Sequence, residues 1–250
     1  MLTTIDEVIE KLDQIVRQSI ETSSPLGYFP ALYKRVTIQV RDAIAAKAFD
    51  DNKRMEILDI VFANRYIEAY QSYQDGRPLT ASWQAAFEAA SKPGLLTLQH
   101  LLLGMNAHIS LDLGIAAAES EKAKPLSLQN DFYAINRILE SLIDDTQKRL
   151  TRIFGPLGIV DRLLGPIDER LSIYSITYAR DKAWTQTLEL SLADEPTSAA
   201  LIAKRDKSVA SFAKHLVHPP RLSIRILLPF VRLLERGNIA TRIKILDTNP

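Results

Sequence analysis

Apolar residues recur three and four positions apart along almost the whole chain, and no run that alternates apolar and polar residues lies between turn signals. A period of three to four residues is typical of amphipathic helices. We therefore predict an all-α protein, a single compact bundle of about eight to ten helices that uses residues 1–250 as one domain.

Capping residues and helix breakers give the expected bounds of these helices. Thr4 and Glu7 form a capping box at the start of the first helix, and the segment SSPLG ends it. After Gly155 we expect a turn, a short helix and a second turn at Gly165-Pro166. Helices are also expected over residues 30–49, from the segment DDNK to Asp75, and over 83–90, 95–121, 127–154 and 167–192. The next helix should run from a cap at Thr197 or Ser198 to His218. The last segment should be a helix kinked at Pro229, followed by a final turn after Gly237-Asn238.

The segment 95–121 is the least polar of the chain, so we expect it to be a central, buried helix. Four residues with special properties lie four positions apart on it, His100, Gly104, His108 and Asp112, and this spacing places them on one ridge of the helix. A buried polar side chain without a partner costs free energy. Polar groups or a metal ion should therefore face the ridge.

His108 and Asp112 are about 6 Å apart along the helix axis, which suits a hydrogen bond, an oriented base or two ligands of one metal ion. We predict that they are a catalytic acid–base pair or metal ligands. His100, about 12 Å from His108, would have a separate catalytic position. Gly104 lacks a side chain at some cost to the helix, which indicates close approach by another helix or a ligand. Asn106 lies on another face, where it would brace a neighbouring helix.

The same row has a structural interpretation, because a His–Asp hydrogen-bond network also fixes helix packing. Three functions stay open. The first is an enzyme that acts on a small organic or lipid-like substrate in a pocket between helices. The second is a non-catalytic ligand-binding or scaffold protein, and the third is a metal-dependent, phosphoesterase-like hydrolase.

The charge balance and the absence of cysteine narrow these alternatives. Lys and Arg total 31 against 30 Asp and Glu, so the chain lacks the basic field that binds nucleic acid. With no cysteine, a divalent metal such as zinc or iron would have to be bound by His and carboxylate ligands. His215 and His218 have a spacing that permits a shared metal, although a helix C-terminus also favours imidazole. No GxxxxGK[ST], GxGxxG or GxSxG motif is present.

The ends of the chain suggest where the protein works. The N-terminal sequence MLTTIDEVIEKLDQIV lacks the pattern of a signal peptide, which favours the cytoplasm. No stretch approaches about 20 consecutive apolar residues, so we expect no membrane-spanning helix. Residues 221–250 are basic and apolar. We expect them to pack on the bundle, the alternative being a peripheral contact with an anionic membrane through Leu227, Leu228 and Phe230.

The segment LQHLLLGMNAHISLDLGIAAA resembles the signature of an uncharacterised, mostly bacterial, all-helical family of unknown function. The segments FANRYIEAY, GRPLTASWQAAFEAA and ARDKAW agree with it, and the resemblance covers roughly residues 30–190. It implies a helical fold. The central segment is also similar, more weakly, to the His- and Asp-bearing helices of zinc-dependent phospholipase C and the nucleases that share its fold.

The resemblance implies a set of site residues on three helices. Arg180 would join the catalytic group by pairing with Asp112 or by clamping an anionic substrate. Arg65 would contact substrate or form a solvated pair with Glu68. Trp83 is expected in the core. The complete expected set is His108, Asp112, His100 and Arg180 for catalysis and Asn106, Gly104, Arg65, Tyr66 and Trp184 for substrate binding.

Overall fold

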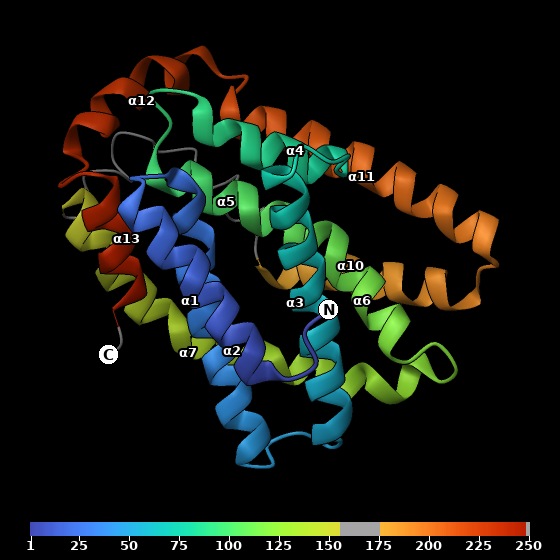
Figure 1. Ribbon diagram of the computed structural model, residues 1–250. Coiled ribbons are helices and arrows are strands. Elements are labelled where there is room, and N and C mark those ends of the chain that lie inside the picture. Colours follow the sequence, from blue (N-terminus) through green and yellow to red (C-terminus); the bar gives the residue numbers. More distant parts are fainter. Residues whose placement is uncertain (156–175, 249–250) are drawn as a thin grey trace.

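The computed structural model describes residues 1–155 and 176–248, and these residues form α-helices with short 3₁₀ and π turns and no β-strand (Figure 1). The prediction of an all-α bundle is confirmed. The helices are α1 (Ile5–Glu21), α2 (Tyr28–Ala45), α3 (Asn52–Gln74), α4 (Ala81–Glu88), α5 (Thr97–Ala107), α6 (Leu113–Ser120), α7 (Gln129–Phe154), α10 (Ile176–Leu192), α11 (Glu195–Val217), α12 (Leu222–Leu234) and α13 (Ile239–Asp247).

Helix ends follow local capping chemistry. The capping box at Thr4 and Glu7 is confirmed, because the Glu7 backbone N–H donates to Thr4 Oγ1 and the Thr4 N–H donates to the Glu7 carboxylate. The prediction of Thr197 or Ser198 as a cap is wrong. Asp194 caps α11 and accepts from the Thr197 N–H, since Pro196 already lies in the first turn.

Two other expected ends also differ. α7 begins after a 3₁₀ turn (Pro125–Leu128), so Ser127 does not cap it. Asn238 caps the helix α13 where a final turn was expected. The turns expected between residues 156 and 166 and the start of the expected helix 167–192 lie outside the described residues.

The expected helix 95–121 forms one continuous run made of α5, the π-helical turn η3 (His108–Asp112) and α6. Helices α2, α3, α4, α10 and α11 pack around this run, which lies across the middle of the bundle in Figure 1. Contrary to the expectation from sequence, the run Thr97–Ser120 is long and apolar enough to cross a membrane. However, 78% of its most apolar window is buried inside the bundle, as in the core helix of a soluble protein.

Gly104 is a point of close approach between α5 and α2. A Cβ atom at this position would lie 2.5 Å from Cγ of Phe29, so only glycine lets the Phe29 ring reach the central helix. The missing side chain therefore admits a neighbouring helix, one of the two occupants expected from the sequence.

We predict that Gly104→Ala destabilises the protein by about 1–3 kcal/mol, because the Phe29 ring must shift in a packed core. Urea unfolding measures this change. An unhindered Gly→Ala change inside a helix would instead stabilise by about 0.5–1 kcal/mol. The sign of the change in the free energy of unfolding therefore distinguishes a crowded position from an unhindered one. An increase would contradict the close approach.

Candidate functional site

His108 and Asp112 occupy the two ends of the π-helical turn η3. A π turn is rare, interrupts the regular i→i+4 hydrogen bonding of an α-helix, and is found frequently at functional sites. Both side chains are buried, at 2% and 1% exposure respectively. The pair predicted from the sequence therefore lies inside the bundle, at the one irregular turn of the central run.

The Asp112 carboxylate accepts hydrogen bonds from two neighbouring helices. Arg65 Nε on α3 donates to Oδ1 at 3.0 Å, and Trp83 Nε1 on α4 donates to Oδ2 at 2.8 Å. His108 Nδ1 lies 3.5 Å from the same Oδ2 atom, at the long limit of a hydrogen bond. A buried carboxylate is costly unless it is paired, so these donors account for its presence in an apolar helix.

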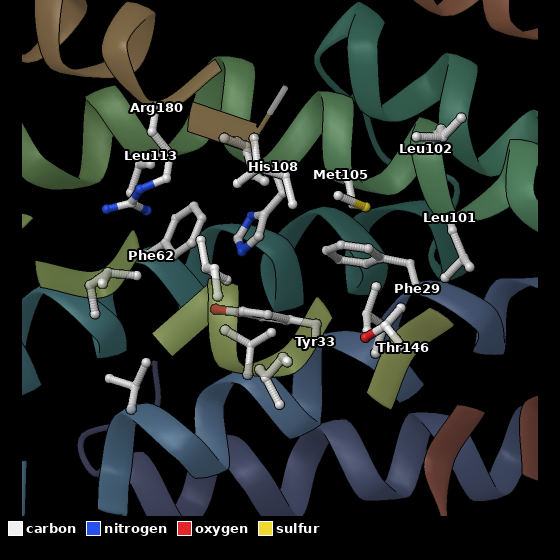
Figure 2. A pocket seen from close by; sticks show the side chains of 18 of the residues that line it. Phe29, Tyr33, Phe62, Leu101, Leu102, Met105, His108, Leu113, Thr146 and Arg180 are labelled. Carbon is white, nitrogen blue, oxygen red and sulfur yellow. The ribbon is translucent and has the colours of Figure 1, made fainter. Parts of the chain in front are cut away.

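The His108 ring is held between aromatic rings (Figure 2). It stacks on Phe62 with centroids 3.6 Å apart, and Tyr33 meets it edge-on at 4.6 Å. Burial lowers the pKa of His108, and the hydrogen bond to Asp112 opposes this effect. The imidazole is therefore neutral near pH 7, and Asp112 favours the tautomer that carries its proton on Nδ1. Nε2 is buried and has no hydrogen-bond partner among the described residues.

A cavity of about 290 Å³ lies against His108 between α2, α3, α5, α7 and α10. Figure 2 shows the His108 ring extending from the central helix into it, with Tyr33 below the ring and Phe29 to its side. Most of the lining is aliphatic or aromatic. The lining groups with polar side-chain atoms are Tyr33, Asp59, His108, Thr146, Gln147 and Arg180.

Asp59 is the functional candidate that the sequence interpretation missed. It is buried on α3, lines the cavity, and its Oδ2 atom has no hydrogen-bond partner in the described part of the chain. Burial, with a smaller contribution from Glu56, raises its pKa to about 7. A signal was available, because Asp59 lies four residues after Met55 and three before Phe62, within the buried stripe of its helix.

Arg180 lines the cavity but does not pair with Asp112. Its Nε donates to Asn136 Oδ1 at 2.6 Å, another nitrogen donates to the Phe132 carbonyl, and its guanidinium lies over the Phe132 ring. These contacts hold it against α7, so Arg65 is the arginine that meets Asp112. Burial lowers the pKa of Arg180 to about 10, and the described residues place no carboxylate within ion-pair distance of it.

The other expected site residues lie outside this cavity. His100 packs beside the Tyr28 ring, and burial lowers its pKa to about 4. Asn106 donates to the Val209 carbonyl on α11, the bracing role expected for it. Tyr66 packs against Phe29 and Trp83, and Trp184 packs against Phe132.

The surroundings of Asp112 do not suit a metal ion. Its oxygens accept from Arg65 and Trp83, and the positive guanidinium would repel a cation. Among the described residues no group of three or more His, Cys, Asp or Glu side chains is placed to bind one. His215 and His218 lie exposed at the end of α11, away from these groups.

The chain matches the model of a known protein family. The model of the "Family of unknown function (DUF5995)" matches residues 5–219, which confirms the resemblance to an uncharacterised family. No curated protein and no solved structure matches the chain. The matched residues include the whole cavity lining and end before α12.

We predict that Asp59→Asn raises the melting temperature at about pH 8 and changes it little at about pH 4. The pKa of Asp59 in the folded protein is raised to about 7, above its ordinary value of 3.8. The folded state thus favours the protonated form, and this stabilisation is lost progressively as the pH rises from about 3.8 to about 7. The neutral amide removes the cost of the buried charge at high pH.

Differential scanning fluorimetry across this pH range measures the effect, with Asp144→Asn as the control because Asp144 is exposed on α7. The control should show no pH-dependent difference from the parent protein. An Asp59→Asn effect of the same size at both pH values would show that Asp59 does not titrate near neutrality.

Proposed function

We propose that this chain, which belongs to the family of unknown function DUF5995, binds a small, mainly apolar molecule that carries one hydrogen-bond donor such as a hydroxyl group. The observation that carries the proposal is the buried, unpartnered Nε2 atom of His108 at the wall of an apolar cavity. Ligand sites in proteins are typically apolar clefts with a few placed polar groups.

The side chains that line the cavity favour a ligand that is mainly apolar. Aliphatic side chains from α2, α3, α5 and α7 form most of the wall, and Phe29, Tyr33 and Phe62 form the wall around His108. Such a surface gains free energy when apolar groups displace water from it. A volume of about 290 Å³ accommodates a medium-length alkyl chain or a small ring system.

The tautomer of His108 determines which polar group of the ligand it can bind. With its proton on Nδ1 towards Asp112, the ring has a lone pair on Nε2. A buried acceptor without a partner costs free energy, which a ligand hydroxyl would recover by donating to it. Asp112, fixed by Arg65 and Trp83, therefore acts as the positioning residue for His108.

The test is displacement of the fluorescent probe N-phenyl-1-naphthylamine by 1-decanol and by its methyl ether, which has no donor. We expect the alcohol to bind about tenfold more tightly than the ether, the worth of roughly one hydrogen bond. In His108→Phe, which preserves the stacking on Phe62, the two affinities should become equal.

Val36→Phe places a larger side chain in the cavity wall and should abolish displacement, whereas Ile38→Phe on the same helix lies outside the lining and is the control. Equal affinities of alcohol and ether for the parent protein would contradict the role of His108. Tighter binding of decanoate that depends on Arg180 would also contradict it, because the ligand would then be an anion.

A second function, acid–base catalysis on the bound molecule, is favoured by Asp59. The cavity has both a neutral imidazole and a carboxyl group with a pKa of about 7, and each group lies at its wall. One base and one acid with pKa values near the working pH are the usual requirement for proton transfer. On a ketone, His108 Nε2 would take a proton from the α-carbon while protonated Asp59 donates one to the carbonyl oxygen.

Deuterium exchange into 2-decanone in D₂O, followed by mass spectrometry, tests this function. We expect the parent protein to exchange the α-hydrogens at least about tenfold faster than His108→Phe or Asp59→Asn. If the three rates are equal while the ligand still binds, the protein is a binding protein without this chemistry.

We also propose that the protein works in the cytoplasm, consistent with a chain that contains no cysteine to form disulfides.

The metal-dependent hydrolase stays the least supported alternative, given the guanidinium beside Asp112.

A further inference from the structure

Helix α12 has two apolar faces. On the inward face Ile224 and Val231 are buried. Val231 belongs to an apolar cluster of the bundle, against which Leu227, Leu228 and Leu234 also pack. This face accounts for the way the helix attaches to the bundle, at whose periphery Figure 1 shows it.

The outward face is apolar as well. At about 100° per residue its large side chains fall within an arc of roughly 80°. The exposed fractions are 66% for Leu222, 57% for Ile226, 59% for Phe230 and 82% for Leu233. A surface helix of a soluble protein normally presents polar residues to solvent on the side opposite its packed face. A contiguous exposed apolar stripe of this kind marks an interaction site.

The charges beside this stripe are positive. Arg221 and Arg225 are exposed along one flank, and Arg236 is exposed just beyond the helix end. α12 contains no acidic residue. The nearby Glu235 is buried, pairs with Arg232 and Arg242, and accepts from the Thr97 N–H, so it offers no negative charge to the surface.

We propose that the outward face of α12 docks on an anionic membrane surface. Leu222, Ile226, Phe230 and Leu233 would enter the headgroup and acyl boundary, while Arg221 and Arg225 contact lipid phosphates. This composition, a basic flank beside an apolar stripe, fits an anionic lipid surface better than an apolar protein partner. Anionic lipids are characteristic of the cytoplasmic leaflet.

The structure changes which residues would face the lipid. Leu227 and Leu228, named as lipid-facing from the sequence, are partly buried in the inward cluster. Only Phe230 of that set is on the outward face. The reason is that the bundle takes the Ile224 and Val231 side of the helix and leaves the opposite side to solvent.

The inward face of α12 shares an apolar cluster with part of the cavity wall. Leu98, Leu101 and Leu150 line the cavity, and they belong to the same apolar cluster as Leu227 and Leu228. A membrane-bound α12 would therefore bring the cavity close to a source of lipid-like molecules. The docking itself does not depend on the proposed ligand.

Vesicle flotation with the full chain tests the proposal. We expect binding to vesicles of equimolar phosphatidylcholine and phosphatidylglycerol and none to phosphatidylcholine alone, with a loss of binding at high salt. The variants Ile226→Ser/Phe230→Ser and Arg221→Glu/Arg225→Glu should each reduce the bound fraction at least about tenfold. Leu126→Ser/Leu192→Ser removes two leucines away from α12 that are more exposed than Ile226 and Phe230, and it should bind normally.

Melting temperatures of all variants, measured in parallel, show that they are folded. Binding that the α12 variants and the control share would overturn the proposal, as would no binding of the parent protein to anionic vesicles. Light scattering after size exclusion gives a further outcome. A stable dimer that Ile226→Ser/Phe230→Ser converts to monomer would assign the stripe to a second copy of the chain instead.

Discussion

The buried carboxylate of Asp112 is the constraint on which the centre of this protein depends. A charge inside an apolar helix costs several kcal/mol unless partners compensate for its lost hydration. Arg65 and Trp83 supply those partners from α3 and α4, so both helices must dock on the central run in one register. The same carboxylate lies beside His108, and the position of the candidate base is thus a consequence of satisfying a buried charge.

Donors from the protein already satisfy the Asp112 carboxylate. The neighbouring His108 has a buried Nε2 atom without a hydrogen-bond partner among the described residues. Phe62 stacks on that ring and Tyr33 meets it edge-on, which restricts its rotation. Asp59, on the same helix as Arg65, adds a carboxyl group whose charge the apolar wall disfavours. The cavity therefore combines a fixed acceptor, a proton donor near neutrality and an apolar wall, a combination suited to a small amphiphilic molecule.

Helix α12 links this interior to the surface. Its inward side packs in an apolar cluster that also includes part of the cavity wall. Its outward side exposes apolar side chains to solvent. The residues of α12 lie beyond those that the family model matches. The proposed ligand site and the proposed docking face thus belong to two different parts of the fold.

The sequence alone determined the features that depend on neighbours within one helix: the all-α class, the capping box at Thr4, the buried central run and the spacing of His108 and Asp112. These follow from local hydrogen bonding and from a period of three to four residues. Only the tertiary structure decided that Arg65 and not Arg180 meets Asp112, that Trp83 donates to it, that Asp59 faces the cavity, and that α12 exposes the side opposite Ile224. Each of those outcomes depends on how helices distant in sequence rotate against one another, and the pattern along a single helix does not contain that information.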